Sequence, residues 1–447
     1  MSFEWSKAQT ISELLSQKGG SIKTGPFGTA LKASEYVQIG VPLISVREIG
    51  HGVFHIDNKT PRVCEATLSR LPEYILQEGD IVFARKGGIE RCALIRSQQA
   101  GWFLGSDGIR LRPPESCDAR FIAYALQTKS VKDWLLQNST GSTMASLNQA
   151  TIGRLPLALP TINEQNKIAD TLEVFDDRIA LLRETNATLE AIAQALFKSW
   201  FVDFDPVHAK ARGESPQGMD DATAALFPDS FEQSELGMIP KGWKVEPIGD
   251  AVECVGGGTP NTKNTEFWEP EEFAWTTPKD LSGIQSPVLL ETERKLSAIG
   301  LAKVSSGLLP IGSLLMSSRA PIGYLAITQI PVAINQGYIA MLPGGCLPPI
   351  YLLFWCQQNM EVIKSHANGS TFMEISKKAF RPLPAIIPDE SIISAFTDLA
   401  EPLFARLVAN EQQAQTLAQL RDTLLPKLIS GQLRLPEAEA LLAEEQP

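Results

Sequence analysis

The chain has 447 residues, of which 44% are hydrophobic and 20% charged, which is typical of a soluble globular protein too long for a single ordinary core. No run of about 18 uncharged apolar residues occurs, and Glu4 and Glu13 interrupt the start of the chain, so the sequence predicts neither a membrane span nor a signal peptide. Six singly placed cysteines favour reduced thiols in a cytoplasm, and the net charge of −11 argues against a general DNA-coating protein.

The charge is distributed unevenly. It is +3 in residues 1–150, −8 in 151–240, −1 in 241–380 and −5 in 381–447. The acidic part could be a solvated helix face or a surface for a partner, and the charge pattern alone is compatible with both.

Residues 1–160 predict a first mixed domain. Short apolar runs such as Val41–Val46 and Asp80–Ala84 alternate with Gly and Pro, which predicts short strands joined by turns. The stretch 119–137 predicts a helix, so the fold class is α+β.

Residues 161–202 predict a long helix. From Ile168 to Trp200, apolar residues recur at alternating spacings of four and three, a pattern that over four heptads indicates a coiled coil. Asn186 falls in this seam, where a buried polar residue commonly fixes register and partner. The alternative is an amphipathic helix that packs separately on a globular core.

Residues 203–240 predict a crossing linker with little core of its own, because four prolines stand among acidic residues there. Residues 241–388 predict a second mixed domain, with a strand near Ser313–Met316 and a helix over 349–365. Residues 389–432 predict a second long helix whose seam runs from Phe396 to Leu428 and includes Asn410, and residues 433–447 form a tail.

The second half of the chain repeats the first. Gly141-Ser142-Thr143 recurs as Gly369-Ser370-Thr371, 228 residues later, and Leu155-Pro156 recurs as Leu383-Pro384. The register holds without a gap from 141 to 201 and from 369 to 429. Two copies of one unit predict a pseudo-two-fold arrangement in which the long helices pair antiparallel and separate the two domains.

No familiar catalytic motif occurs in the sequence, which lacks GxxxxGK[ST], strand-linked GxGxxG, HExxH and GxSxG. His51 and His55 have the spacing of two metal ligands on a helix, but flanking glycines oppose a helix and no third ligand is apparent, so no zinc site is predicted. A nuclease site at Asp389-Glu390 or at 269–272 is the catalytic alternative. Those acids lie beside prolines and lack the following lysine of common nuclease cores.

Several motifs together resemble the specificity subunit of type I DNA restriction–modification enzymes, and the resemblance covers nearly the whole chain. The motifs are Phe197-Lys198-Ser199-Trp200-Phe201-Val202-Asp203-Phe204-Asp205-Pro206-Val207, Ser234-Glu235-Leu236-Gly237-Met238-Ile239-Pro240-Lys241-Gly242-Trp243, Trp275-Thr276-Thr277-Pro278-Lys279-Asp280-Leu281, Ser318-Arg319-Ala320-Pro321-Ile322-Gly323 and Asn335-Gln336-Gly337. The first domain departs from this pattern, with Arg85-Lys86-Gly87-Gly88-Ile89 in place of 318–322 and Ser106-Asp107-Gly108 in place of 335–337.

The resemblance implies a division of labour between subunits. Each mixed domain would be a target-recognition domain for one half of a bipartite, asymmetric DNA site, and the helices would set the spacer. Two methyltransferase subunits would bring S-adenosylmethionine, and restriction subunits would bring ATP, Mg²⁺ and translocation. This chain would bind no cofactor and no metal and would have no catalytic residues, and it would work in the cytoplasm. The alternative function is a coiled-coil interaction scaffold without a DNA role.

Candidate DNA contacts follow from side-chain chemistry, because Arg suits guanine and Asn or Gln suits adenine. In the second domain they are Gly257, Gly258, Thr259, Asn261, Lys263, Thr276, Lys279, Arg319, Asn335 and Gln336; in the first domain they are Lys23, Thr24, Arg85, Lys86 and Arg91. Any of these could instead contact a phosphate or no DNA at all. The repeated Gly-Ser-Thr elements could bind phosphate or serve as turn and cap residues. We also expect Phe197, Trp200 and Phe201 to be exposed in the isolated chain, as part of a partner surface.

Overall fold

The computed structural model describes residues 8–28, 30–141, 145–369 and 373–434. The chain divides into two compact units: unit 1 comprises residues 1–178 and 417–447, and unit 2 comprises 179–416. Each unit contains one mixed domain and a part of both long helices. We call residues 8–160 domain 1 and residues 241–388 domain 2.

Domain 1 contains two small sheets with strand orders β2-β9-β6-β7 and β3-β5-β4-β8. Its central strand, β6, is apolar and buried along its whole length, because Ile81 and Phe83 pack into one hydrophobic core and Val82 and Ala84 pack into another. In chain order the elements are β1 (Gln9–Thr10), α1 (Ile11–Lys18), β2 (Ser21–Thr24), η1 (Ala33–Glu35), β3 (Tyr36–Val37), β4 (Val41–Ile44), β5 (Arg62–Val63), α2 (Glu65–Arg70), η2 (Pro72–Tyr74), β6 (Ile81–Ala84), β7 (Cys92–Leu94), η3 (Ser97–Gln99), β8 (Phe103–Leu104), β9 (Gly108–Arg112), α3 (Ala119–Gln127), α4 (Lys129–Asn138), α5 (Gln149–Arg154) and β10 (Pro156–Leu157).

Domain 2 also contains two principal sheets, with strand orders β14-β21-β18-β19-β16 and β17-β15-β20. Its elements are β13 (Lys244–Pro247), α9 (Ile248–Ala251), β14 (Cys254–Val255), η4 (Thr265–Phe267), β15 (Phe273–Thr276), α10 (Pro278–Leu281), β16 (Val288–Leu289), β17 (Arg294–Leu296), α11 (Ala298–Leu301), β18 (Leu314–Ser317), β19 (Leu325–Thr328), β20 (Ala333–Ile334), β21 (Tyr338–Met341), α12 (Pro349–Gln358), α13 (Met360–Ser365), α14 (Lys377–Phe380) and β22 (Pro384–Ile387).

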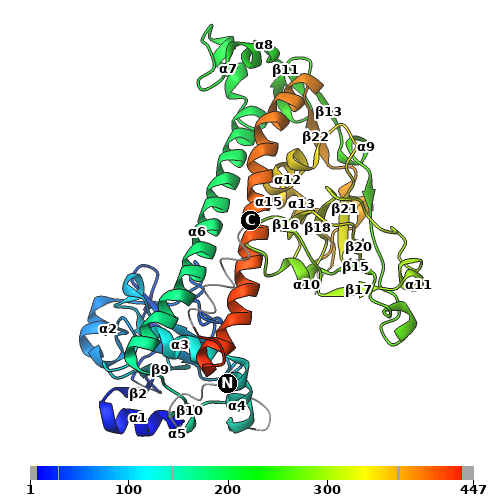
Figure 1. The fold of residues 1–447 in the computed structure, drawn as a ribbon. Coiled ribbons are helices and arrows are strands. Elements are labelled where there is room, and N and C mark those ends of the chain that lie inside the picture. Colours follow the sequence, from blue (N-terminus) through cyan, green and yellow to red (C-terminus); the bar gives the residue numbers. More distant parts are fainter. Residues whose placement is uncertain (1–7, 29, 142–144, 370–372, 435–447) are drawn as a thin grey trace. The chain divides into compact units, whose positions relative to one another are not determined.

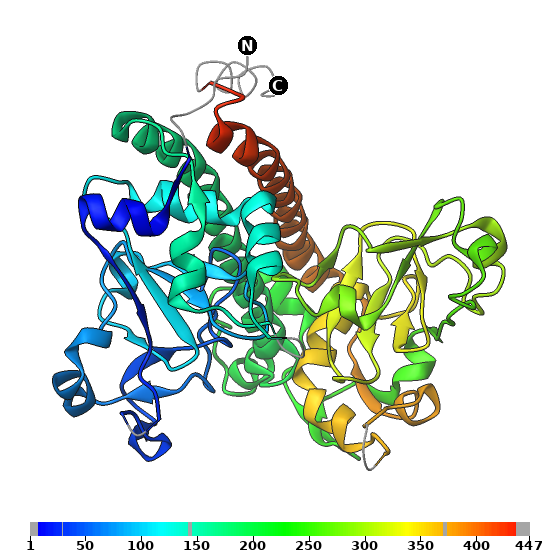
Figure 2. The same ribbon diagram turned by 90° about the horizontal axis from the view of Figure 1, so that it is seen from below.

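The two domains share one strand topology. The buried strand β6 pairs antiparallel with β7 and β9, as β18 pairs with β19 and β21. β4 pairs parallel with β8, as β15 pairs with β20. Figure 2 shows the strands of domain 1 in blue and cyan and those of domain 2 in green and yellow. The structure therefore confirms that the sequence repeat encodes two copies of one α+β fold.

Each domain begins and ends at a two-stranded ladder. β1 pairs antiparallel with β10, and β13 pairs antiparallel with β22. The chain therefore leaves each domain next to the point where it entered, directly before a long helix begins.

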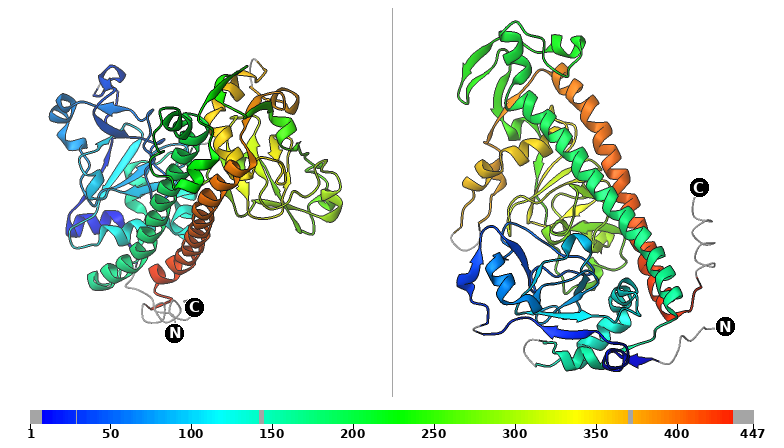
Figure 3. Two further views of the ribbon diagram at one scale, coloured as in Figure 1. Left: turned by 90° about the horizontal axis from the view of Figure 1, so that it is seen from above. Right: turned by 90° about the vertical axis from the view of Figure 1, so that its left-hand side faces the viewer.

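The long helices are α6 (Ile162–Phe201) and α15 (Glu390–Ser430). In unit 2, Asn410 Nδ2 donates to Asn186 Oδ1 at 2.9 Å, and Trp200 packs against Phe396. Because one helix advances from 186 to 200 while its partner runs back from 410 to 396, the pair is antiparallel, and Figure 1 and Figure 3 show the helices side by side. The predicted antiparallel pair is confirmed, and separate packing of each helix is wrong.

The two seam asparagines bond to each other. Asn186 and Asn410 are each 2% exposed, and Asn186 Nδ2 also donates to the Leu407 carbonyl at 3.2 Å. A buried amide pair of this kind fixes the register because no neighbouring seam position offers the same donor and acceptor.

The predicted linker is folded. α7 (Asp205–Ala211), α8 (Asp221–Leu226) and the hairpin β11 (Phe231–Ser234) to β12 (Gly237–Pro240) occupy it. Val207, Phe227 and Ile239 are buried in the core of unit 2, so the prediction of little core is wrong. Pro206 lies in the first turn of α7, where the missing N–H costs no hydrogen bond, so this proline is compatible with a helix.

The aromatic end of α6 is buried in unit 2. Phe197 and Phe201 each lie 4.9 Å from Tyr351 of α12, centroid to centroid, and both contact Phe396 of α15. The expectation that Phe197, Trp200 and Phe201 form an exposed partner surface is therefore wrong, since the aromatic rings hold domain 2 to both helices.

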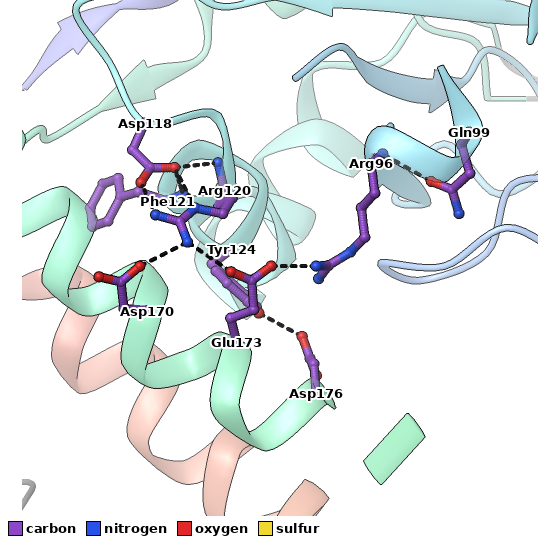
Figure 4. Close-up of polar contacts among 9 residues, drawn as sticks. All are labelled: Arg96, Gln99, Asp118, Arg120, Phe121, Tyr124, Asp170, Glu173 and Asp176. Atoms are coloured by element: carbon purple, nitrogen blue, oxygen red, sulfur yellow. Dashed lines mark hydrogen bonds and ion pairs between the residues drawn. The ribbon is translucent and has the colours of Figure 1, made fainter. Parts of the chain in front are cut away.

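In unit 1, a network of charged side chains adds to the apolar contacts between domain 1 and the long helices (Figure 4). Arg120 of α3 binds Asp170 at 2.8 Å and Glu173 at 2.7 Å on α6, and Arg96 also binds Glu173. The Tyr124 hydroxyl donates to Asp176 at 2.6 Å, and Arg421 of α15 pairs with the same carboxylate. Domain 1 is thus joined to the helices by ion pairs in addition to a buried apolar core that includes Phe121 and Leu172.

Within the described ranges, no helix is long and apolar enough to cross a membrane. The six cysteines all lie in this part of the chain, and all are free thiols.

Candidate nucleic-acid interface

The candidate residues of domain 1 gather at one edge of its first sheet. β2 ends at Thr24 opposite Ile109, and β6 ends at Ala84 opposite Gly108. The residues that follow β6 and the turn that precedes β9 therefore meet at the end of β2. Backbone hydrogen bonds fasten this edge, because Arg85 N–H donates to the Asp107 carbonyl at 2.9 Å.

The cations of this edge are held by local partners. The Arg85 guanidinium lies 4.4 Å from the ring centroid of Phe27, which is 53% exposed, and Lys86 Nζ lies 3.8 Å from Asp107. Lys23 lies 3.9 Å from Glu73, and Arg91 donates to the Gly87 carbonyl at 2.8 Å. Ion pairs between half-exposed groups are weak, so these cations can exchange their partners for phosphate or base edges at little cost.

Thr24 has a defined partner at the same edge. Its hydroxyl accepts a hydrogen bond from Gln149 Nε2 at 3.1 Å, which brings the start of α5 beside the end of β2.

Domain 2 presents the equivalent edge. β14 leads into a loop of residues 256–264, β18 leads into Arg319, and the turn of residues 335–337 precedes β21. Ser318 N–H donates to the Gly337 carbonyl at 2.8 Å, and the Thr259 hydroxyl donates to Gln336 Oε1. The structure therefore brings together candidates that lie far apart in the sequence.

The remaining candidates of this edge differ in how their side chains are held. Arg319 Nη1 lies 3.6 Å from Glu374, and Asn335 Oδ1 accepts from Gly337 N–H at 2.8 Å. Asn261 Oδ1 accepts from the backbone N–H of Lys263 at 3.0 Å, and Lys263 itself is exposed.

The two glycines of the loop have a backbone role. A side chain at Gly257 would place its Cβ 1.8 Å from the Ile334 carbonyl oxygen, so only glycine fits there. Gly258 N–H donates to the same carbonyl at 3.0 Å.

Two candidates of domain 2 stand apart from this edge group. Thr276 is 0% exposed, and its hydroxyl lies 3.1 Å from the Tyr338 hydroxyl, so a direct contact with DNA is contradicted by its burial. Lys279 lies in α10 and pairs with Glu293 at 2.8 Å; that hydrogen bond raises the pKa of Lys279.

The backbone hydrogen bonds show which residues of the two domains are equivalent, and they correct one of the two predicted matches. Arg85 and Ser318 are equivalent, as predicted, because Leu147 N–H donates to Arg85 and Ile375 N–H donates to Ser318 in the same way. Ser106-Asp107-Gly108, however, does not match Asn335-Gln336-Gly337. Gly105 N–H bonds to Ile44 as Asn335 N–H bonds to Thr276, so the matching turn begins one residue earlier, at Gly105.

Sequence reasoning missed Lys377. Its terminal carbon and nitrogen lie 3.3 and 3.4 Å from the position that a Cβ of Gly256 would take, and its side chain is exposed. The gapless 228-residue repeat makes it the counterpart of Gln149, which contacts Thr24 at the same place in domain 1. The equivalence of Lys377 and Gln149 in the repeat is the sequence signal that could have identified Lys377.

The repeated Gly-Ser-Thr elements lie largely outside the described residues, which exclude 142–144 and 370–372. Their flanks are described: Thr140 pairs with Ser146 beside Lys86, and Asn368 pairs with Glu374 beside Arg319. Both elements therefore begin and end at the candidate edges.

The fold defines a protein of two equivalent α+β domains whose corresponding edges carry different side chains. Comparison with known proteins identifies its family. A family model described as the type I restriction modification DNA specificity domain matches residues 27–191 and again 240–419.

Curated relatives are similar to this chain over most of its length. The specificity subunit of the type I restriction enzyme HindI of Haemophilus influenzae is 27% identical over 340 residues, which cover 67% of this chain and 73% of that protein. The specificity subunit of the enzyme MjaIX of Methanocaldococcus jannaschii is 25% identical over 415 residues, or 91% and 90% of the two chains. A crystal structure of a type I restriction–modification S subunit from M. genitalium has the same fold, with a TM-score of 0.52 and 19% identity over 94% of this chain and 95% of that one.

The chain therefore belongs to the family of type I restriction–modification specificity subunits, the non-catalytic components of these enzymes.

Proposed function

We propose that this chain binds a bipartite, asymmetric DNA site and that the candidate edge of each domain reads one half of it. The observation that supports this is a common backbone frame with exchanged side chains. Arg85-Lys86 of domain 1 corresponds to Ser318-Arg319 of domain 2. Gly105-Ser106-Asp107 corresponds to Asn335-Gln336-Gly337. Because base edges are distinguished by hydrogen-bonding side chains, the same frame with different side chains suits two different half-sites.

The proposal assigns chemistry to partner subunits. Two methyltransferase subunits bring S-adenosylmethionine to the DNA and dock on the helical part of this chain, and restriction subunits supply translocation and cleavage with ATP and Mg²⁺. The complex works in the cytoplasm. The net charge of −11 is compatible with this role, because positive charge is needed only where phosphates are contacted.

A domain exchange tests the proposal. Residues 1–150 are replaced by those of a relative that recognises another site, the chain is produced together with its methyltransferase subunits, and methylated adenines are mapped across the host genome. We expect one half-site to change while the other half-site and the spacer stay the same. A change in both halves contradicts independent reading.

The same complex decides between recognition and a scaffold without a DNA role. A scaffold predicts no preference of the purified complex for the mapped duplex over a scrambled duplex of equal length. The chain alone, given S-adenosylmethionine, should not methylate DNA, whereas the complex should.

A further inference from the structure

Two buried tryptophans form hydrogen bonds to the backbone of the loop of residues 256–264 in domain 2. Trp275 Nε1 donates to the Gly258 carbonyl at 3.2 Å, and Trp268 Nε1 donates to the Asn261 carbonyl at 3.2 Å. Both indoles thus bind backbone acceptors of the loop that carries Thr259, Asn261 and Lys263. Buried tryptophan generally needs such a partner for its N–H group.

The two rings form one rigid support. Trp268 and Trp275 meet edge to face, with centroids 5.1 Å apart and planes at 82°. The Arg294 guanidinium lies 3.5 Å from the Trp268 centroid and 5.6 Å from that of Trp275. Both rings are buried together with Leu296, Val304 and Ala333. They are therefore shielded from any DNA that approaches the loop, while the loop's polar side chains are exposed.

Domain 1 lacks this support at the position of Trp275. The parallel ladders pair Ile44 with Leu104 and Thr276 with Ile334, which makes Leu43 the counterpart of Trp275. A leucine has no hydrogen-bond donor, so the loop after β2 cannot be held by the same bond. Among the described residues, the bond from Trp275 to the loop therefore has no counterpart at Leu43 in domain 1.

We infer that Trp268 and Trp275 are positioning residues for the second half-site: their indole N–H groups fix the backbone of loop 256–264, so that its side chains meet the bases in one arrangement. This inference rests on the proposed function. A contact that is preorganised by buried donors loses less conformational freedom on binding, and discrimination between right and wrong bases falls when the loop is free to adapt.

The test uses the complex with its methyltransferase subunits and three duplexes: the methylated site found by genome mapping, the same site with its first half replaced, and the same site with its second half replaced. Trp268→Phe and Trp275→Phe each remove the N–H group and keep an aromatic ring. We expect each variant to bind the full site about three- to tenfold more weakly, the range for one lost hydrogen bond. Affinity for the duplex with a replaced second half should stay the same, so the preference for the second half-site falls and the preference for the first half-site does not.

Trp243→Phe is the matched control. Trp243 is buried in the same unit, but its indole N–H has no hydrogen-bond partner among the described residues. The Trp243→Phe variant loses as much ring area as the two test variants, but it loses no hydrogen bond to the loop. Its preferences for both half-sites should therefore equal those of the original chain. Because each preference is a ratio of affinities, a partly inactive preparation does not alter it.

The outcomes separate the inference from the proposed function. If the unmodified complex prefers neither half-site, the proposed function fails. If it prefers both, and the tryptophan variants keep the second preference or lose both equally, the positioning role is overturned. Amide hydrogen exchange gives a second measurement: in Trp275→Phe, exchange should accelerate in residues 256–264 and remain unchanged in β18 and β21.

Discussion

Arg319 shows how one side chain can be poised for recognition. It follows the buried strand β18, and its guanidinium lies beside Glu374 at 3.6 Å, an ion pair weak enough to yield to DNA. We predict that Arg319→Ala weakens binding to the full site by about 1–3 kcal/mol, the range for a bidentate base contact. Competition binding against matched and mismatched duplexes measures this.

The control variant for Arg319→Ala changes Glu374, the ion-pair partner of Arg319. Glu374→Gln frees the guanidinium and should retain or increase specific affinity, because it removes a competing carboxylate. An equal loss of matched and mismatched binding in Arg319→Ala would assign the residue to a phosphate instead.

Residue chemistry can be read from the sequence more easily than residue surroundings. The polar candidates at strand ends were chosen from side-chain chemistry, because Arg suits guanine and Asn or Gln suits adenine, and their contacts with DNA stay predictions. The prediction for Thr276 is wrong for a physical reason: its buried hydroxyl is paired with the Tyr338 hydroxyl, 62 positions away, which the local sequence does not reveal. Lys377 was missed because its proximity to Gly256 arises only when the sheet is assembled.

The seam asparagines lead to a prediction at the scale of elements. Asn410→Leu leaves Asn186 Oδ1 buried without its donor, which should lower the free energy of unfolding by about 1–3 kcal/mol. The double variant Asn186→Leu, Asn410→Leu should cost less than the sum of the two single variants, because it removes both halves of the bond. Urea unfolding measures all three.

An exposed neighbour serves as reference for the asparagine series. Gln412 lies two residues from Asn410 on the solvent side of α15, and Gln412→Leu should change stability by no more than about 0.5 kcal/mol. Strictly additive costs of the two asparagine changes would contradict their coupling.

The ionic network of unit 1 predicts a pH dependence. Burial opposes ionisation of Glu173, but hydrogen bonds and charge from Arg120 and Arg96 outweigh it and lower its pKa below the ordinary value of 4.5. A carboxylate whose pKa is lower in the folded state stabilises the fold above the unfolded pKa, and this stabilisation is lost as pH falls through the folded value. The stability of unit 1 should therefore decline as pH falls below about 4.5, and Glu173→Gln should flatten that decline.

Glu401 provides the comparison for Glu173. It occupies the equivalent repeat position on α15 and is exposed, so Glu401→Gln should leave the pH profile of thermal unfolding unchanged. At neutral pH, we expect Glu173→Gln to cost about 1 kcal/mol, because the ion pairs are partly open to solvent. A profile for Glu173→Gln that parallels the unmodified chain would contradict the assignment.

Long periodic elements were the most predictable part of the fold. A 4-3 pattern accumulates signal over many turns, whereas short segments depend on a few residues. The predicted helix over 119–137 is interrupted at Thr128, whose backbone is extended and whose hydroxyl donates to the Ala125 carbonyl at 2.7 Å. The linker was misread because proline marks both flexible segments and first turns of helices.

If each domain reads one half-site, as proposed, the length of the paired helices should set the spacer between the two halves. Insertion of one heptad in both α6 and α15 preserves the seam and lengthens each helix by roughly 10 Å at 1.5 Å per residue. The preferred spacer should then grow by about three base pairs at about 3.4 Å per base step. The measurement is the spacing between methylated half-sites in a genome that expresses the variant.

The spacing, rather than the affinity, decides that test, since added length also rotates one half-site about the duplex axis. An active variant that retains the original spacer would show that the helices do not set the distance.

The ladder at the base of each domain has a consequence for inheritance. Because β13 and β22 lie side by side, all of domain 2 is bounded by crossover points within 244–247 and 384–387. Recombination between related genes at these two points would exchange the whole of domain 2 and leave the long helices intact. The corresponding boundaries of domain 1 are 9–10 and 156–157, where β1 pairs with β10. If each domain reads one half-site, as proposed, such an exchange would change the DNA specificity without any change of fold.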